Sequence, residues 1–169
     1  MPETIQFYPF DITYKIIEEK AVIHMWGRTK EGKQYLILDP DYQPYFYIIP
    51  KKGKNVEAKL KKIEVEHANS IAKVTKTEKI KKRYLGKEVE VIKTYVSLPR
   101  DVPIIRDVVK EWDIIESCHE YSIPFWKRYS IDKNIMPLAQ IVVTGELQEQ
   151  KSKVPVIKAT SITIEKEEY

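Results

Sequence analysis

The chain has 169 residues, of which 43% are hydrophobic and 32% charged, and its formal net charge is +4. This length allows one domain, or one domain and a tail, and it can bury enough surface to fold without a metal or a disulfide. The only cysteine, Cys118, excludes an internal disulfide and fits a reducing compartment. The N-terminus lacks a secretion-signal pattern and no apolar run reaches membrane-spanning length, so we expect a soluble, cytoplasmic protein with no membrane partner. The mildly basic charge leans toward a polyanionic ligand, and the interleaved Lys and Glu are compatible with a thermophilic origin.

The first forty residues predict a small antiparallel meander. Alternating residues from Phe7 to Glu18 predict a first strand, which turns at residues 19–20 and returns over residues 21–29. Residues 30–33 contain a turn signal, and a third strand is expected over residues 34–38.

The next eighty residues predict the order β-α-β-β-α-β. Strands are expected at 44–49, 71–80, 89–98 and 114–118, with helices at 56–66 and from Asp101 through an apolar stripe that ends at Trp112. This order is the ferredoxin-like plan, which RNA-recognition modules share and use to offer their sheet to unstacked bases. We therefore predict an α+β protein: an antiparallel β meander, a ferredoxin-like βαββαβ unit, and a C-terminal helix with strands.

The segment after this unit predicts a short helix with a mixed face. With Pro124 at its first position, Phe125, Arg128, Tyr129 and Asp132 fall on one side. A ring, a guanidinium, a phenol and a carboxylate can together hold a base and a phosphate. A capped surface helix with a salt bridge explains the same residues equally well. Beyond residue 134 the pattern weakens, with strands expected over 138–144 and 154–164.

Motifs for catalysis or metal binding are mostly missing. No glycine-rich phosphate loop is present, the three histidines lack metal-ligand spacing, and Cys118 and His119 would point to opposite faces of a strand. Asp39 and Asp41 are better explained as a turn cap than as metal ligands. We therefore expect no cofactor, no metal and no catalytic residue in this chain.

Two clusters suit phosphate groups, although each also has a plain structural interpretation. A proline-stiffened loop leads into the helix that carries Arg106. The N-terminus of this helix and the Arg106 side chain could hold a phosphate. Basic residues also surround a predicted hairpin turn, where they are either a solvated turn or a contact to a nucleic-acid backbone: Lys79, Lys81, Lys82, Arg83 and Lys87.

Taken in order, several segments resemble the N-terminal domain of archaeal family B DNA polymerases. They are Asp11-Ile12-Thr13-Tyr14, Gln43-Pro44-Tyr45-Phe46-Tyr47, Lys82-Arg83-Tyr84-Leu85-Gly86-Lys87, Pro99-Arg100-Asp101-Val102-Pro103-Ile104-Ile105-Arg106 and residues 123–133. Each segment is modest alone, but the ordered set is specific and covers about residues 8–137. The resemblance implies a domain over residues 1–137, divided into a meander (1–40), a ferredoxin-like unit (41–120) and a helix (121–137). Residues 138–169 would be tail strands leading toward an absent exonuclease domain.

The resemblance implies a domain that reads the single-stranded template ahead of the polymerase active site and captures uracil or hypoxanthine. A tight apolar wall could exclude the C5 methyl of thymine, and backbone amides could reject cytosine. The residues that match the family's base pocket are Tyr14, Pro44, Tyr45, Pro99, Asp101, Val102, Pro103, Ile123, Pro124, Phe125 and Tyr129. Arg106 and Arg128 would hold the flanking phosphates.

The chain also departs from the family's pattern. The exonuclease Asp-x-Glu motif is not clearly present, since Ile162-Thr163-Ile164-Glu165 has Thr in place of Asp, and the palm carboxylates are absent. The chain would then be non-catalytic, and its partners would be template DNA and the exonuclease and polymerase domains of a parent or split-gene protein. Two alternatives stay open: a generic single-strand binder that uses Tyr45, Tyr47 and Tyr95, and a docking domain for other polymerase domains or subunits.

Overall fold

The structure is a computed structural model that describes residues 2–119, 123–136, 138–148 and 154–164. The chain forms two compact units. Residues 1–42 and 124–169 make up the first, and residues 43–123 make up the second. We call them the barrel unit and the sheet unit.

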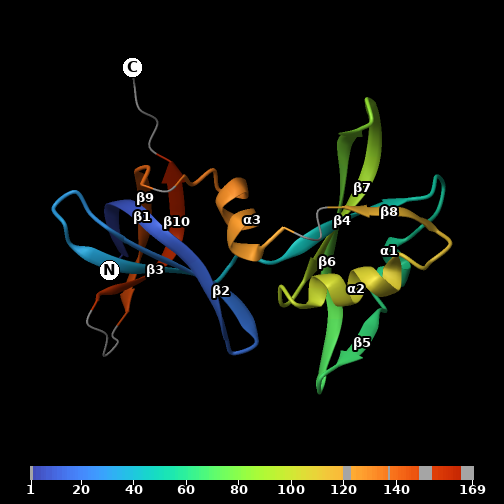
Figure 1. The fold of residues 1–169 in the computed structure, drawn as a ribbon, viewed down its shortest axis with the longest axis horizontal. Helices are drawn as coiled ribbons and strands as arrows, with labels where there is room; N and C mark the ends of the chain where they lie inside the picture. The colour runs from blue at the N-terminus through green and yellow to red at the C-terminus, as the bar shows by residue number, and fades with distance from the viewer. Residues whose placement is uncertain (1, 120–122, 137, 149–153, 165–169) are drawn as a thin grey trace. The chain divides into compact units, whose positions relative to one another are not determined.

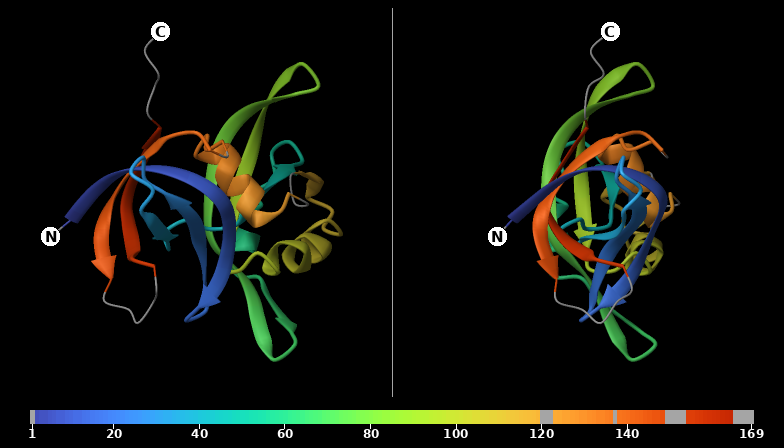
Figure 2. Two further views of the ribbon diagram at one scale, coloured as in Figure 1. Left: turned by 60° about the vertical axis from the view of Figure 1, so that its left-hand side comes forward. Right: turned by 90° about the vertical axis from the view of Figure 1, so that its left-hand side faces the viewer.

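The barrel unit is a closed five-stranded barrel (Figure 2). The predicted meander is present as β1 (Pro2–Ile17), β2 (Lys20–Arg28) and β3 (Gln34–Asp39). The late strands β9 (Ile141–Gln148) and β10 (Val156–Ile164) complete it in the order β1-β2-β3-β10-β9. Because β10 pairs in parallel with β3 and β9 pairs antiparallel with β1, residues 141–148 and 156–164 are part of this barrel wall.

Apolar side chains and the helix α3 (Phe125–Asp132) fill the barrel core. Phe7, Ile23 and Met25 from the strands pack in one cluster with Phe125 and Tyr129 from the helix. Two glycines permit close backbone approach: a side chain on Gly27 would meet the Tyr8 carbonyl and the Phe7 ring, and one on Gly145 would meet the Lys158 carbonyl. At these two positions the packing leaves no room for a side chain.

The sheet unit has the predicted ferredoxin-like connectivity with one additional strand (Figure 1). Its elements are β4 (Tyr45–Pro50), α1 (Glu57–Leu60), β5 (Glu64–His67), β6 (Ser70–Tyr84), β7 (Lys87–Val96), α2 (Asp101–Val109) and β8 (Ile115–His119). The strand order is β5-β6-β7-β4-β8, and all pairs are antiparallel. The α+β class predicted from the sequence is thus confirmed.

One predicted helix is wrong in its extent. A helix was expected over residues 56–66, but α1 ends at Leu60 and residues 64–67 form β5. Ile63 and Val65 are β-branched and favour a strand, and the left-handed pair Ala68 and Asn69 turns that strand back onto β6. The second helix also ends early, at Val109, so that Trp112 packs against the core from beyond its end.

Candidate nucleic-acid interface

Several of the predicted pocket residues gather at one end of the sheet unit. The start of β4 lies beside the end of β7, because Tyr45 pairs with Tyr95 and the Pro44 carbonyl accepts the Val96 N–H at 3.0 Å. The chain then turns through Pro99 into α2. This arrangement brings Pro44 next to the segment that carries Pro99 and Asp101, as a shared base pocket requires.

Asp101 closes that turn with two hydrogen bonds to Leu98. The Asp101 backbone N–H donates to the Leu98 carbonyl at 2.9 Å, and the Asp101 carboxylate accepts the Leu98 N–H at 3.3 Å. The carboxyl group is buried, and this desolvation raises its pKa, partly offset by the Leu98 N–H. Asp101 therefore holds the loop in shape, which makes it a positioning residue for any ligand bound there.

The helix α2 supplies the remaining candidates in this unit. Val102 is buried in the core cluster with Phe46 and Ile105, whereas Pro103 is exposed. Arg106 is half-buried, and its guanidinium lies 2.8 Å from the Asp107 carboxylate. Tyr45 projects to the other face of the sheet, where its ring contacts Tyr95, so a base held against Val102 could meet Tyr45 only at its backbone.

The barrel unit holds three of the aromatic candidates, Tyr14, Phe125 and Tyr129. The ring of Phe125 lies edge-on to Tyr14, with centroids 5.1 Å apart, and tilted against Tyr42 at 5.4 Å. Tyr42 also contacts Tyr129 edge-on at 5.0 Å, so four rings form one cluster. The sequence analysis did not single out Tyr42, although it stands directly before the matched Gln43-Pro44 segment.

The predicted helix face points into the barrel core. Phe125, Arg128 and Tyr129 are all buried. The Tyr129 hydroxyl donates to the buried Asp39 carboxylate at 2.8 Å, and this burial and the neighbouring carboxylate raise the pKa of the phenol. The other Asp39 oxygen accepts the Asp41 N–H, which confirms the turn cap. Asp132 accepts a hydrogen bond from the Tyr42 hydroxyl, so the interpretation of this segment as a plain surface helix is wrong.

Ile123 and Pro124 stand at the limits of the two units. Ile123 is half-buried in the sheet unit, and Pro124 is exposed at the position that precedes the first residue of α3. The candidate residues are therefore divided between the two units. Four of the eleven base-pocket residues lie in the barrel unit, namely Tyr14, Pro124, Phe125 and Tyr129, and so does the phosphate candidate Arg128.

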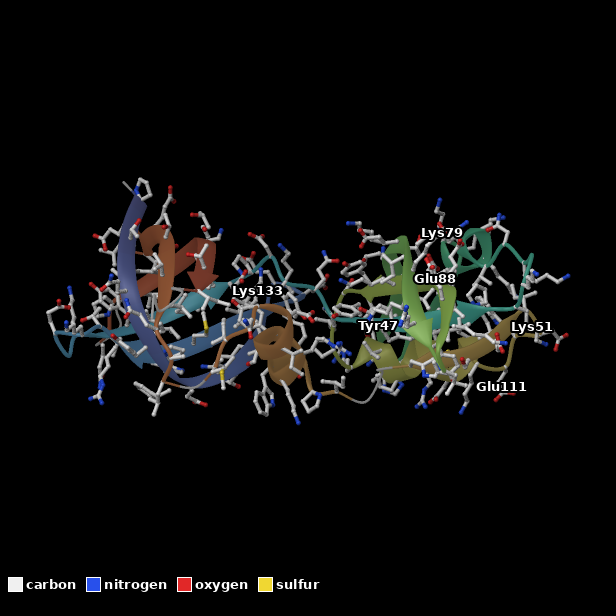
Figure 3. The ribbon with its side chains drawn as sticks, turned by 90° about the horizontal axis from the view of Figure 1, so that it is seen from above. Tyr47, Lys51, Lys79, Glu88, Glu111 and Lys133 are labelled. Atoms are coloured by element: carbon white, nitrogen blue, oxygen red, sulfur yellow. The ribbon has the colours of Figure 1, made fainter. Side chains whose placement is uncertain are left out.

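The face of the sheet opposite the helices carries tyrosines covered by lysines. The rings of Tyr45 and Tyr47 lie 5.5 Å apart, and those of Tyr45 and Tyr95 lie 5.6 Å apart. The Lys93 ammonium lies 4.2 Å from the Tyr45 ring centroid, and the Lys82 ammonium lies 3.8 Å from that of Tyr47. Figure 3 labels Tyr47 on this sheet. We call this surface the tyrosine–lysine face.

Metal and thiol chemistry find little support in the described part of the chain. Across residues 2–119, 123–136, 138–148 and 154–164, no three His, Cys, Asp or Glu side chains are grouped so as to hold a metal ion. Burial raises the pKa of the Cys118 thiol to about 11, so that the thiolate is disfavoured at neutral pH. His119 contacts the Ser117 hydroxyl at 2.7 Å and the Tyr84 ring at 4.9 Å. In the same described ranges, no helix is long and apolar enough to cross a membrane.

The homologues of this chain are archaeal family B DNA polymerases, which confirms the resemblance drawn from the sequence. The DNA polymerases of Desulfurococcus sp. (strain Tok) and Thermococcus gorgonarius are each 38% identical over 128 residues, which is 76% of this chain. DNA polymerase 1 of Pyrococcus abyssi is 35% identical over the same length. No family model matches the sequence.

The fold agrees with these relatives. The family B DNA polymerase from the hyperthermophilic archaeon Pyrobaculum calidifontis superposes with a TM-score of 0.83 over 98% of this chain, at 24% identity. The chain spans only 16% of the length of the three curated relatives named above and 21% of that solved chain. The similarity is thus to one part of such polymerases, and not to their whole length.

Proposed function

We propose that this chain is a non-catalytic template-reading domain of a family B DNA-directed DNA polymerase. It binds single-stranded template DNA and recognises the deaminated bases uracil and hypoxanthine ahead of the active site. The parent protein is a polymerase with 3′-5′ exonuclease activity, and its other domains are partners of this chain. The observation that carries the proposal is the meeting of Pro44, Pro99 and Asp101 at one end of the sheet unit, within a chain homologous to DNA polymerases.

The proposed discrimination between uracil and thymine depends on steric exclusion by rigid side chains. Two prolines and a buried valine present little freedom to move, so a methyl group at C5 of the base would have to displace packed atoms. Discrimination by one methyl is worth about 10-fold or more in affinity. The base must leave its stack before it can reach such a site, which requires a single-stranded template.

The test compares two oligonucleotides that differ only by uracil or thymine, bound to the full chain at one salt concentration. We expect the uracil oligonucleotide to bind about 10-fold more tightly. Equal affinity would refute the base-specific function. Val102→Ala should lower the ratio of uracil to thymine affinity, because it removes two methyl groups beside the site. Since Val102 is part of the core, the folding of this variant is checked by urea unfolding.

The role of Arg128 as a phosphate ligand is tested with two variants of the helix α3. Arg128→Ala should weaken the binding of both oligonucleotides alike, because a phosphate contact carries no base information. Since Arg128 is buried, the folding of this variant is checked by urea unfolding. Lys127→Ala is the matched control, since Lys127 is an exposed cation one residue away on α3. If both variants weaken binding equally, the effect is one of general charge and Arg128 has no special role.

A second candidate function is favoured by the tyrosine–lysine face. Aromatic rings backed by cations are the elements of sequence-tolerant single-strand binding. This function predicts equal affinity for uracil and thymine oligonucleotides, similar binding of RNA and DNA, and loss of binding in Lys82→Gln with Lys93→Gln. A third candidate, docking to other polymerase domains, is favoured by apolar side chains exposed on the barrel unit, among them Phe10, Trp126 and Met136. It predicts that a fragment carrying the other domains co-purifies with this chain.

A further inference from the structure

The strands β6 and β7 extend past the rest of the sheet as a two-stranded ribbon (Figure 1). β4 pairs with β7 only from Tyr95 to Ile92, and β5 pairs with β6 only over residues 70–73. The five pairs from Ile80–Val91 to Tyr84–Lys87 therefore have no third strand beside them. We call residues 79–90 the ribbon.

The ribbon has a clear excess of basic residues. Its residues include five basic and two acidic side chains, a formal charge of +3 out of +4 for the whole chain. Lys79 pairs with Glu90 at 3.7 Å and Lys81 with Glu88 at 4.0 Å, all largely exposed, so solvent screens both pairs. Figure 3 labels Lys79 and Glu88 on the two strands. A projecting basic ribbon is complementary to a polyanion.

The tip of the ribbon is unusual in chemistry and in backbone conformation. Leu85 and Gly86 occupy the two central positions of the turn, with φ values of 51° and 78°. Two left-handed residues form a type I′ turn, which prefers Asn-Gly and disfavours a branched apolar residue at its first position. The Leu85 side chain is 85% exposed, so packing within the protein does not compensate for this conformation.

The chain contains an internal comparison for this turn. The β1–β2 and β5–β6 hairpins also turn through two successive residues with positive φ, Glu18-Glu19 and Ala68-Asn69. Polar or small residues satisfy the geometry there. The turn geometry therefore does not require a leucine, and the apolar side chain at the ribbon tip is available for a ligand.

From these observations we infer that the ribbon tip is a wedge that inserts Leu85 between stacked bases of DNA at a junction of single and double strands. Apolar wedges between base steps, with flanking cations on the phosphates, are an established way for protein elements to open a stack. At a junction the terminal base pair is stacked on one side only, so insertion there disrupts less stacking than insertion within the duplex. Lys81, Arg83 and Lys87 stand on the strands beside the tip, where they can reach the phosphates. This inference rests on the proposed function, because it assumes that the chain meets template DNA.

The test uses the full chain and a forked DNA duplex with 2-aminopurine in the last base pair before the fork. Binding of the wild-type chain should raise the 2-aminopurine fluorescence, because insertion unstacks that base. Leu85→Asn should bind the fork about tenfold more weakly and give no rise. The same substitution creates Asn-Gly, so the thermal unfolding midpoint should stay constant or increase.

The matched control is Ala68→Asn, which introduces the same residue at the same position of the β5–β6 turn. It should leave fork binding and fluorescence unchanged. Fork binding by Leu85→Asn that equals the wild type, or wild-type binding without a fluorescence rise, overturns the wedge. The uracil–thymine affinity ratio on single strands is measured in parallel. If the fork result is negative while this ratio persists, only the wedge fails; if the ratio is also absent, the proposed function fails as well.

Discussion

The barrel unit and the sheet unit use their aromatic residues in opposite ways. The barrel closes on itself, and Phe7, Phe125 and Tyr129 fill its interior. The sheet packs its helices against one face and holds Tyr45 and Tyr47 under lysines on the other. A ring inside a closed barrel is required for folding, whereas Tyr45 and Tyr47 are buried beneath lysine side chains that a ligand would have to displace before it met the rings. Substitutions of these barrel rings should therefore act on stability, and substitutions on the exposed parts of the sheet unit should act on binding.

Glycine substitutions should show the largest contrast between the units. A methyl group on Gly145 would lie 2.2 Å from the Lys158 carbonyl oxygen, inside the barrel wall. Gly145→Ala should lower the free energy of unfolding by about 3 kcal/mol, because backbone atoms must move apart. Gly86 at the ribbon tip meets no atom within 4 Å, and Gly86→Ala should cost about 1 kcal/mol for its positive φ alone. Urea unfolding measures both, and similar losses would contradict the contrast.

Removal of single hydroxyl groups should give a smaller contrast of the same sign. Tyr129→Phe leaves the buried Asp39 carboxylate without its 2.8 Å donor and should cost about 1–3 kcal/mol. Tyr95→Phe removes a 3.3 Å hydrogen bond to Glu78 at the exposed sheet surface and should change stability by less than about 0.5 kcal/mol. Chemical denaturation of both variants provides the measurement. A cost for Tyr95→Phe equal to that of Tyr129→Phe would show that the sheet face is also required for folding.

The smallest contrast should be in the pH dependence of stability, which should have opposite signs for His24 in the barrel unit and Asp101 in the sheet unit. Burial lowers the pKa of His24 in the barrel, so its contribution to stability is complete above the unfolded value of about 6.5 and is lost as the pH falls through the folded value. Burial raises the pKa of Asp101, so its contribution is complete below the unfolded value of about 3.9 and is lost as the pH rises through the folded value.

Two conservative variants isolate these groups. His24→Gln should make stability less sensitive to a change from pH 7 to pH 5. Asp101→Asn can still accept the Leu98 N–H, and it should be more stable than the wild type at pH 7 by less than about 1 kcal/mol but not at pH 3. Urea midpoints at the two pH values decide both cases. A wild-type advantage over Asp101→Asn at pH 7 would show that the ionised carboxylate is the favoured form.

Much of this protein follows from its sequence alone. Alternating apolar residues predicted the strands of the meander and of the ferredoxin-like unit, and the ordered segments from Asp11 to Lys133 indicated the polymerase relationship. Periodicity failed at residues 61–66, where Ile63 continues the helical stripe of Val56 and Leu60 but also alternates with Val65 as in a strand. Local pattern cannot separate the two where an apolar run is short.

Only the tertiary structure decided where the side chains of these elements point. Helical spacing placed Phe125, Arg128 and Tyr129 on one face, but the closed barrel turned that face toward the core and brought Tyr42 and Asp39 against it. The pairing of β9 and β10 with β1 and β3 joins residues more than a hundred positions apart, which no local pattern records. The exposure of Leu85 likewise depends on how far β6 and β7 extend beyond their neighbours. The sequence determines which segments form elements, because that depends on local period, while long-range pairing determines which residues those elements bury.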